Sequence, residues 1–195
     1  MKQYLIIYKP YLVLSQFSAV DGKQTLADLF PVAKDVYPVG RLDNDSEGLL
    51  ILSNDATLNH RLLHPKFLHE REYYVQVDGA ITHEALLQLQ NGVDINIDGK
   101  IYHTKKCAAA FFESEPKLPQ RDPPIRFRKN IPATWIKIIL HEGKNRQVRK
   151  MCAKVGFPVL RLIRVRINKI ELENLQPGQM KELSKEEVYK KLFRE

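Results

Sequence analysis

Three carboxylic acids lie close together in the segment 38–55, whose sequence is PVGRLDNDSEGLLILSND. Asp43, Asp45 and Glu47 belong to a polar turn, and the apolar run 49–52 follows that turn directly. The pattern predicts a tight loop that leads into a buried strand. Loops on a rigid scaffold commonly present reactive groups, and an ionised carboxylate there can act as a nucleophile or a base.

The spacing of the acids also resembles the start of an EF-hand calcium loop, but that pattern fails at two positions. Its fifth residue should be Asp or Asn and is Glu47, and its twelfth should be a bidentate Glu and is Asn54. Another alternative is that the Asp, Asn and Ser side chains only cap the turn through hydrogen bonds to their own backbone. The turn by itself leaves chemistry and capping both open.

The overall composition predicts a soluble protein of the cytoplasm. The chain has 195 residues, enough for one medium domain or two small lobes, and 44% of them are hydrophobic. No apolar run approaches the ~20 residues that span a bilayer, and Lys9-Pro10 interrupts the first apolar run before a signal-peptide core could form. We therefore expect no membrane segment.

The cysteines and histidines predict neither a disulfide framework nor a metal site. Cys107 and Cys152 are too few for a four-cysteine zinc site, and their sparing use suits a reducing compartment. His60 and His64 are one helical turn apart, but the residues between them lack the Glu of a His-Glu-x-x-His motif.

The net charge of +8 is unevenly distributed along the chain. Between Lys117 and Arg166 there are fourteen Lys or Arg residues and only two acids, Asp122 and Glu142. This imbalance favours a polyanionic partner. Nucleic acid is favoured over a membrane surface, because no basic amphipathic helix with a Trp or Phe face is present.

Apolar periodicity and turn residues predict a chain of mixed strands and helices. We expect strands near residues 4–8, 49–52, 71–79, 93–97, 106–112, 135–140 and 157–165. We expect helices at 25–30, from a cap at Asn54 or Asp55 to about 64, at 82–92, at 145–156, and after a capping box that begins at Ser184.

The segment 113–134 contains five prolines and the basic cluster RDPPIRFRK. So many prolines exclude the core of a sheet, which leaves a passive linker or an extended basic arm. The aromatic residue among the positive charges favours an arm that binds RNA.

The segment from Asn145 to Gly156 predicts a helix that Asn145 caps and Gly156 ends. Its apolar face carries Val148, Met151, Cys152 and Val155, and its opposite face carries Arg146, Lys150 and Lys154. Arg149 lies at the margin, where its side chain could reach into a cleft and pair with a carboxylate. The alternative is a basic helix on the surface.

Four motifs together resemble those of RNA pseudouridine synthases of the RsuA type. Gly-Arg-Leu-Asp at 40–43, followed by Ser-Glu-Gly-Leu-Leu and Leu-Ser-Asn-Asp, resembles the signature of the family. The segment 142–149 resembles Glu-Gly-x-Asn-Arg-Gln-x-Arg, and 71–75 resembles Lys-x-Tyr-x-Val, with Arg71 in place of the Lys. Lys9-Pro10 resembles the Lys-Pro that follows the first strand of these enzymes.

The resemblance implies a catalytic role for three residues. Asp43 matches the catalytic Asp, Tyr73 matches the Tyr that stacks on the target base, and Arg149 matches the Arg that pairs with the Asp. From the strand pattern alone, Tyr73 could equally be an ordinary strand aromatic. For contacts to RNA we expect the basic residues Arg41, Arg71, Arg121, Arg126, Arg128, Lys129, Lys144, Arg146, Lys150, Arg161 and Arg164.

The resemblance also implies a fold and a substrate. The expected fold is α+β, one catalytic domain over residues 1–195 with a mixed, largely antiparallel sheet, flanking helices and a central cleft, possible division into two lobes, and no S4 module. The expected partner is 23S ribosomal RNA, at a uridine near the peptidyl-transferase centre, and we expect a monomer. Isomerisation involves no net redox change and no external group, so we expect no cofactor.

Two rival functions remain open. A noncatalytic RNA-binding or ribosome-assembly protein would explain the charge, but it would give Asp43 no role beside Gly40 and Arg41. A methyltransferase would need a glycine-rich nucleotide loop, which the sequence lacks.

Overall fold

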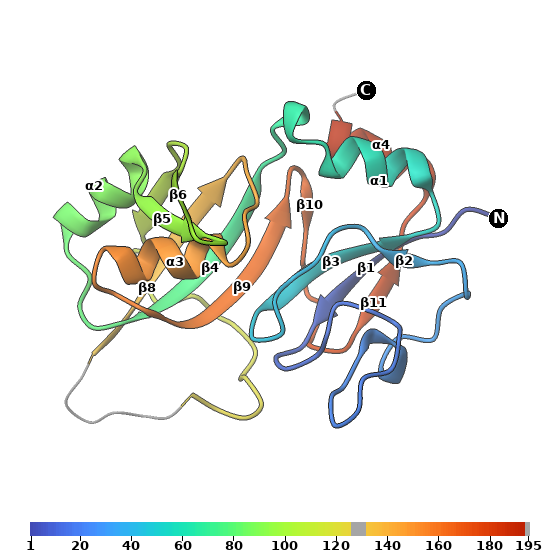
Figure 1. The fold of residues 1–195 in the computed structure, drawn as a ribbon. Coiled ribbons are helices and arrows are strands. Elements are labelled where there is room, and N and C mark those ends of the chain that lie inside the picture. The colour runs from blue at the N-terminus through green and yellow to red at the C-terminus, as the bar shows by residue number, and fades with distance from the viewer. Residues whose placement is uncertain (126–131, 194–195) are drawn as a thin grey trace. The chain divides into compact units, whose positions relative to one another are not determined.

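The structure is a computed structural model, and it describes residues 1–125 and 132–193. The chain divides into two compact units (Figure 1). The first contains Met1–His69 with Ile163–Glu195, and the second contains Glu70–Leu162. The predicted arm residues Arg126, Arg128 and Lys129 lie outside the described residues.

The first unit is built around two neighbouring antiparallel strands, β1 (Tyr4–Lys9) and β3 (Glu47–Ser53). Every residue of both strands is buried, as expected for strands covered on both faces. The strand β9 (Val159–Ile167) starts in the second unit, continues into the first and pairs with β3 in parallel. The short strands β2 (Tyr37–Pro38), β10 (Ile170–Glu171) and β11 (Met180–Glu182) pair with β3, β9 and β1.

The helices of the first unit are short, and two of them have the caps that the sequence predicts. They are η1 (Leu26–Asp28), α1 (Ala56–Leu63), η2 (Pro65–Phe67) and α4 (Lys185–Phe193). Asp55 caps α1 by accepting the Thr57 N–H. Ser184 and Glu187 form the predicted capping box, since each side chain accepts the other residue's N–H.

The second unit contains an antiparallel sheet, a hairpin and two helices. The sheet joins β4 (Arg71–Asp78), β8 (Ala133–Leu140) and β7 (Ala108–Phe111), and the hairpin joins β5 (Asp94–Ile97) to β6 (Lys100–His103). The helices are α2 (His83–Asn91) and α3 (Gln147–Lys154). The predicted α+β class with a mixed, largely antiparallel sheet is confirmed.

Two local predictions were wrong. The residue before α3 is Arg146 rather than Asn145, and it has a left-handed backbone with φ of 51°. The turn closes later than expected because Gln147 bonds Lys144 twice, through its N–H and through its side-chain oxygen. The helix expected at 25–30 is only the single 3₁₀ turn η1, since Pro31 follows within three residues.

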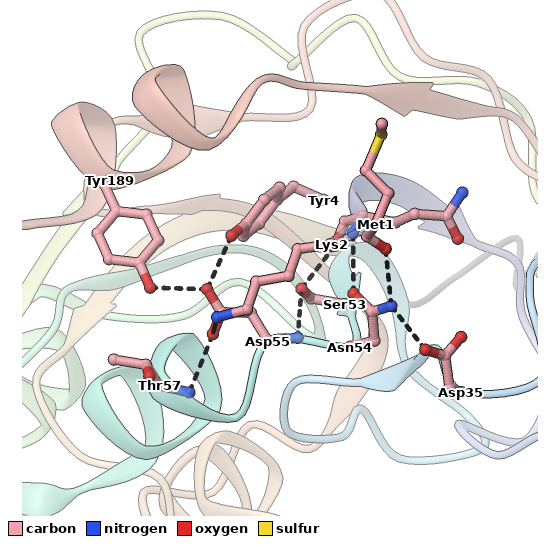
Figure 2. A network of polar contacts seen from close by, with 10 residues as sticks. Met1, Lys2, Tyr4, Asp35, Ser53, Asn54, Asp55, Thr57 and Tyr189 are labelled. Carbon is pink, nitrogen blue, oxygen red and sulfur yellow. Dashed lines mark hydrogen bonds and ion pairs between the residues drawn. The ribbon is translucent and has the colours of Figure 1, made fainter.

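A buried carboxylate, that of Asp55, joins the two ends of the first unit (Figure 2). Its Oδ2 accepts hydrogen bonds of 2.8 Å from the hydroxyls of Tyr4 and Tyr189, and its Oδ1 accepts one of 2.8 Å from Lys2 Nζ. Burial alone would raise the pKa of Asp55, but these bonds and the Thr57 N–H outweigh it and hold the pKa well below its usual range. The charged carboxylate thus stabilises the packing of α4 and the N-terminus.

We predict that Asp55→Asn lowers the free energy of unfolding at pH 7 by roughly 2–4 kcal/mol, because several donors lose a buried charged acceptor. Asp35→Asn is the matched control, since its exposed carboxylate accepts from Asn54 at the edge of the same network and its replacement should cost little. Urea titrations measure both variants.

The same comparison has a predicted pH dependence. Because the pKa of folded Asp55 lies below its ordinary value of 3.8, its stabilising effect is complete above pH 3.8 and is lost as the pH falls through the folded value. The stability difference between wild type and Asp55→Asn should therefore shrink below pH 3.8. A difference independent of pH would contradict this role of the charge.

Candidate active site

Asp43 lies half-buried in the loop that joins β2 to β3. The loop closes as a turn, because the Ser46 N–H donates to the Asp43 carbonyl at 3.0 Å. The neighbouring residue, Leu42, is bonded twice to Ser15, whose hydroxyl donates to the Leu42 carbonyl at 2.8 Å and accepts the Leu42 N–H at 3.1 Å. Ser15 and Leu42 are both buried, so the Asp43 loop is fixed to the segment 10–16.

Lys9, the last residue of β1, also supports the Asp43 loop. Its side chain is fully buried, and its Nζ donates to the carbonyls of Pro10 at 2.8 Å and Val13 at 2.7 Å. The carbonyl of Asn44 lies 3.5 Å from the same nitrogen and accepts the Leu12 N–H at 2.9 Å. The predicted Lys-Pro motif therefore organises the segment against which the Asp43 loop rests.

Lys9 also interacts electrostatically with the acids of the loop. Burial lowers the pKa of Lys9 to about 7, and the negative charges of Glu47, Asp45 and Asp43 oppose this shift. Asp43 is thus within electrostatic range of a buried amine. A carboxylate on a fixed loop, within the electrostatic range of a buried amine, is an arrangement that can serve nucleophilic or base chemistry.

Close packing fixes the strand that follows the loop. Gly48 has a φ of +107°, and a Cβ added to it would lie 2.2 Å from the carbonyl oxygen of Arg164 on β9. Only glycine fits this position, which explains the Gly in the motif. Arg164 is buried, and its Nε donates to the Leu49 carbonyl at 2.8 Å.

The second unit carries the other two predicted catalytic residues. Tyr73 lies in β4 opposite Ile138 of β8, and 9% of it is exposed. Arg149 lies on α3 and is half-buried at the margin of the apolar face, as its spacing predicts. Its Nη1 lies 3.5 Å from the Val159 carbonyl. Asp43 belongs to the first unit.

A network of hydrogen bonds holds the turn before α3. The buried Gln147 side chain donates to Glu142 Oε1 at 2.6 Å, and Glu142 Oε2 accepts the Tyr102 hydroxyl at 2.5 Å. The bond to Glu142, together with burial, raises the pKa of Tyr102 to about 12. Both Glu142 and Gln147 are motif residues, and their observed contacts hold the helix that carries Arg149.

The basic residues predicted to bind RNA fall into two groups. Arg41, Lys144 and Arg146 are exposed, and Arg71 and Lys150 are half-buried. The Lys144 ammonium lies over the Tyr102 ring, with its Nζ 4.7 Å from the ring centroid. The residues of this first group present charge to solvent, as phosphate contacts require.

The remaining described arginines of that prediction bond to the backbone of the protein. Arg161 is buried and donates to the Pro119 carbonyl at 2.9 Å, and Arg164 is the buried residue that holds β3. Arg121 is half-buried and donates to the Pro123 carbonyl at 2.8 Å. Burial thus gives Arg161 and Arg164 a role in holding the fold.

The described part of the chain gives little support for a reactive cysteine or a metal site. Burial raises the pKa of Cys107 to about 11 and that of Cys152 to about 12, so neither thiol ionises near neutral pH. Among residues 1–125 and 132–193, no group of three His, Cys, Asp or Glu side chains could hold a metal ion. No helix within the same ranges has the length and apolarity to cross a membrane.

Comparison with solved structures places this fold among pseudouridylate synthases. One structure, described as a crystal structure of pseudouridylate synthase, is similar with a TM-score of 0.78 and 25% sequence identity. The likeness covers 98% of this chain and 74% of that one. The human RNA pseudouridylate synthase domain containing 1 has the same fold, with a TM-score of 0.55 at 14% identity over 93% of this chain and 78% of that chain.

Sequence comparison then gives the family. The family described as RNA pseudouridylate synthase matches residues 3–154, so the chain belongs to the RNA pseudouridylate synthase family. It is 48% identical to the ribosomal large subunit pseudouridine synthase E of Vibrio parahaemolyticus, over 93% of this chain and 74% of the relative. It is 46% identical to the enzyme of the same name from Xanthomonas axonopodis pv. citri, over 89% of this chain and 90% of the relative. The resemblance that the motifs predict is confirmed.

Ser15 is a functional candidate that the sequence patterns did not indicate. We predict that Ser15→Ala lowers the single-turnover rate of uridine isomerisation about tenfold, because it leaves the buried Leu42 N–H unsatisfied and loosens the loop of Asp43. Ser18→Ala, at an exposed position of the same segment, is the control. An unchanged rate in Ser15→Ala would show that the double hydrogen bond does not position Asp43.

Proposed function

We propose that this enzyme converts a uridine of 23S ribosomal RNA, near the peptidyl-transferase centre, to pseudouridine, and that Asp43 carries the reaction. The observation that supports Asp43 most is its half-buried position on a loop fixed by the buried side chains of Ser15 and Lys9. The names of the relatives support ribosomal large-subunit RNA as the substrate. We propose a monomer that acts in the cytoplasm.

The reaction needs few chemical groups. The bond between N1 of uracil and C1′ of the ribose breaks, the base turns, and a bond forms between C5 and C1′. The proton on C5 is lost and N1 gains one, so atoms and electrons balance without an external reagent. An ionised carboxylate can start the reaction in two ways. It can attack the sugar, or it can remove the 2′ proton of the sugar, and Asp43 can do either.

Tyr73 and Arg149 complete the proposed site. The target uridine has to leave its stack, which costs a few kcal/mol, and stacking on the Tyr73 ring would return roughly 1–3 kcal/mol. The Arg149 guanidinium would stabilise the negative charge of Asp43 and of the groups that form from it. Their support is the match of each residue to a motif of the family and, for Arg149, its half-buried place on α3.

Basic residues would supply the remaining affinity through phosphates. The exposed Arg41, Lys144 and Arg146 are suited to this, as are Arg71, Arg121 and Lys150, which are partly accessible. We propose that the arm residues Arg126, Arg128 and Lys129 contribute as well. Phosphate contacts place the RNA, and the flipped base is what the site recognises.

The proposal predicts that Asp43→Asn abolishes turnover and leaves RNA affinity nearly unchanged, because a neutral amide can neither attack nor accept a proton. Release of tritium from ribosomal RNA labelled at C5 of uridine measures turnover, since C5 loses its hydrogen in the reaction. Substantial release by Asp43→Asn would show that the reaction does not depend on the Asp43 carboxylate.

A second prediction separates Arg149 from its basic neighbours. Arg149→Ala should lower the single-turnover rate at saturating RNA about 10- to 100-fold, because the reacting carboxylate loses its charge partner. Lys150→Ala should weaken binding and leave that rate nearly unchanged. The same holds for Arg146→Asn, chosen because Asn tolerates the left-handed backbone at this position. If Arg146→Asn lowers the single-turnover rate and Arg149→Ala does not, the roles assigned to the two arginines are reversed.

A third prediction concerns the arm. RNA binding should weaken steeply with salt, and replacing Arg126, Arg128 and Lys129 together should flatten the slope of log affinity against log salt by about one unit for each phosphate that the arm no longer neutralises. Fluorescence anisotropy at several salt concentrations measures the slope. An unchanged slope in the triple variant would mean that the arm is only a linker.

A further inference from the structure

A short segment of the first unit exposes rings and cations together. It comprises the end of α1 and the turn η2, and we call its residues His60, Leu63, His64, Lys66 and Phe67 the Phe67 surface. Leu63 is 45% exposed and Phe67 38% exposed. Large apolar side chains that a short segment leaves in solvent together mark a place of contact with a partner.

The charge of the segment indicates what kind of partner fits. No Asp or Glu occurs from Ala56 to His69, whereas Arg61, Lys66 and three histidines do. A surface with cations and without carboxylates is complementary to a polyanion. An acidic partner with planar apolar groups, such as single-stranded RNA, matches both the charge and the rings.

The rings form a continuous row. His60 and His64 are 5.4 Å apart between centroids, and His64 and Phe67 are 5.9 Å apart in an edge-to-face arrangement. Phe67 is in turn stacked on the buried His69, at 6.0 Å and with 28° between the planes. Lys66 Nζ lies 4.8 Å from the centre of the Phe67 ring, which puts a cation beside the exposed aromatic side chain.

Hydrogen bonds fix the support of this row before any ligand arrives. His69 Nε2 bonds the Arg61 carbonyl at 2.9 Å, and His69 Nδ1 bonds the side-chain amide of Asn168 at 2.7 Å. Both ring nitrogens of the residue beneath Phe67 are therefore engaged. The Lys66 N–H donates to His64 Nδ1 at 3.3 Å. A ring held in place in the free protein loses little entropy when a base stacks on it.

The Phe67 surface adjoins the loop of Asp43 within the same unit. A Cβ added to Gly40, the first residue of the Gly-Arg-Leu-Asp motif, would lie 3.0 Å from Leu63 Cδ2. A strand of RNA that places one nucleotide at Asp43 can therefore pass its neighbouring nucleotides over Leu63 and Phe67.

We propose that the Phe67 surface binds unpaired nucleotides next to the target uridine, with a base stacked on Phe67 and a phosphate paired with Lys66. This inference rests on the proposed function and names where the first unit holds the substrate. The Lys66 ammonium does not block the ring, because an exposed cation–π contact is weaker than a base–aromatic stack. On binding, the ammonium exchanges the ring for a phosphate.

The test measures binding of two probes, a short oligouridylate and an abasic oligomer of equal length, by fluorescence anisotropy. Phe67→Leu should bind oligouridylate about tenfold more weakly, since one stack is lost, and should bind the abasic oligomer as wild type does. Lys66→Gln should weaken both probes and reduce the salt slope by about one. Leu87→Ala, an exposed apolar residue of α2, is the control and should change neither.

A fluorescence measurement complements these affinities. Phe67→Trp in a Trp135→Phe background carries a single indole, whose fluorescence oligouridylate should quench and the abasic oligomer should not. Equal losses for both probes in Phe67→Leu, unchanged binding of oligouridylate, or no base-dependent quenching would each overturn the proposal. If the Phe67 results hold while the wild type forms no pseudouridine in ribosomal RNA, the proposed function fails and the binding surface remains.

Discussion

The loop of Asp43 depends on one constraint, its attachment to the segment 10–16 by buried polar side chains. Ser15 satisfies both backbone groups of Leu42, and Lys9 bonds the carbonyls around it at the end of β1. A buried backbone group without a partner is costly, so the loop cannot move away without losing these bonds. The backbone of the Asp43 loop is therefore positioned by contacts among buried residues of the chain itself. Burial of the Lys9 amine carries a cost of its own, visible in its lowered pKa, which the loop contacts have to offset.

Other contacts of the first unit keep the strands β1 and β3 in place. The Asp55 network joins the start of the chain to α4 near its end, through hydroxyls on Tyr4 and Tyr189. On the other side of β3, the close approach at Gly48 holds the strand against β9. Both contacts link segments far apart in sequence, one near the start of β3 at Gly48 and the other just after its end at Asp55. The Phe67 surface would then give this compact unit its own contacts with RNA.

The sequence predicts most of the elements and several helix caps well, for identifiable reasons. The run before Ser53 is apolar throughout, and Asp55, Thr82 and Ser184 are caps that bond their own helices locally. Ser15 was not predictable, because its partner Leu42 is 27 residues away and a lone serine in a loop has no pattern. Arg161 and Arg164 were expected to contact RNA, and net charge could not tell that these cations of a strand turn inward to backbone carbonyls. The strands β6 and β11 were missed because they are short and mostly exposed, as with Ile101 at 72%.

We propose that catalysis needs the Asp43 carboxylate at the place that the loop defines, and not only a negative charge nearby. The most direct measurement maps pseudouridines in the ribosomal RNA of cells that lack the gene and carry wild type or Asp43→Glu on a plasmid. Glu keeps the charge but moves it by one methylene group, and a misplacement of about 1 Å can cost 10²-fold in rate. We expect that wild type restores the missing pseudouridine and that Asp43→Glu, expressed at the same level, does not. Full restoration by Asp43→Glu would contradict it.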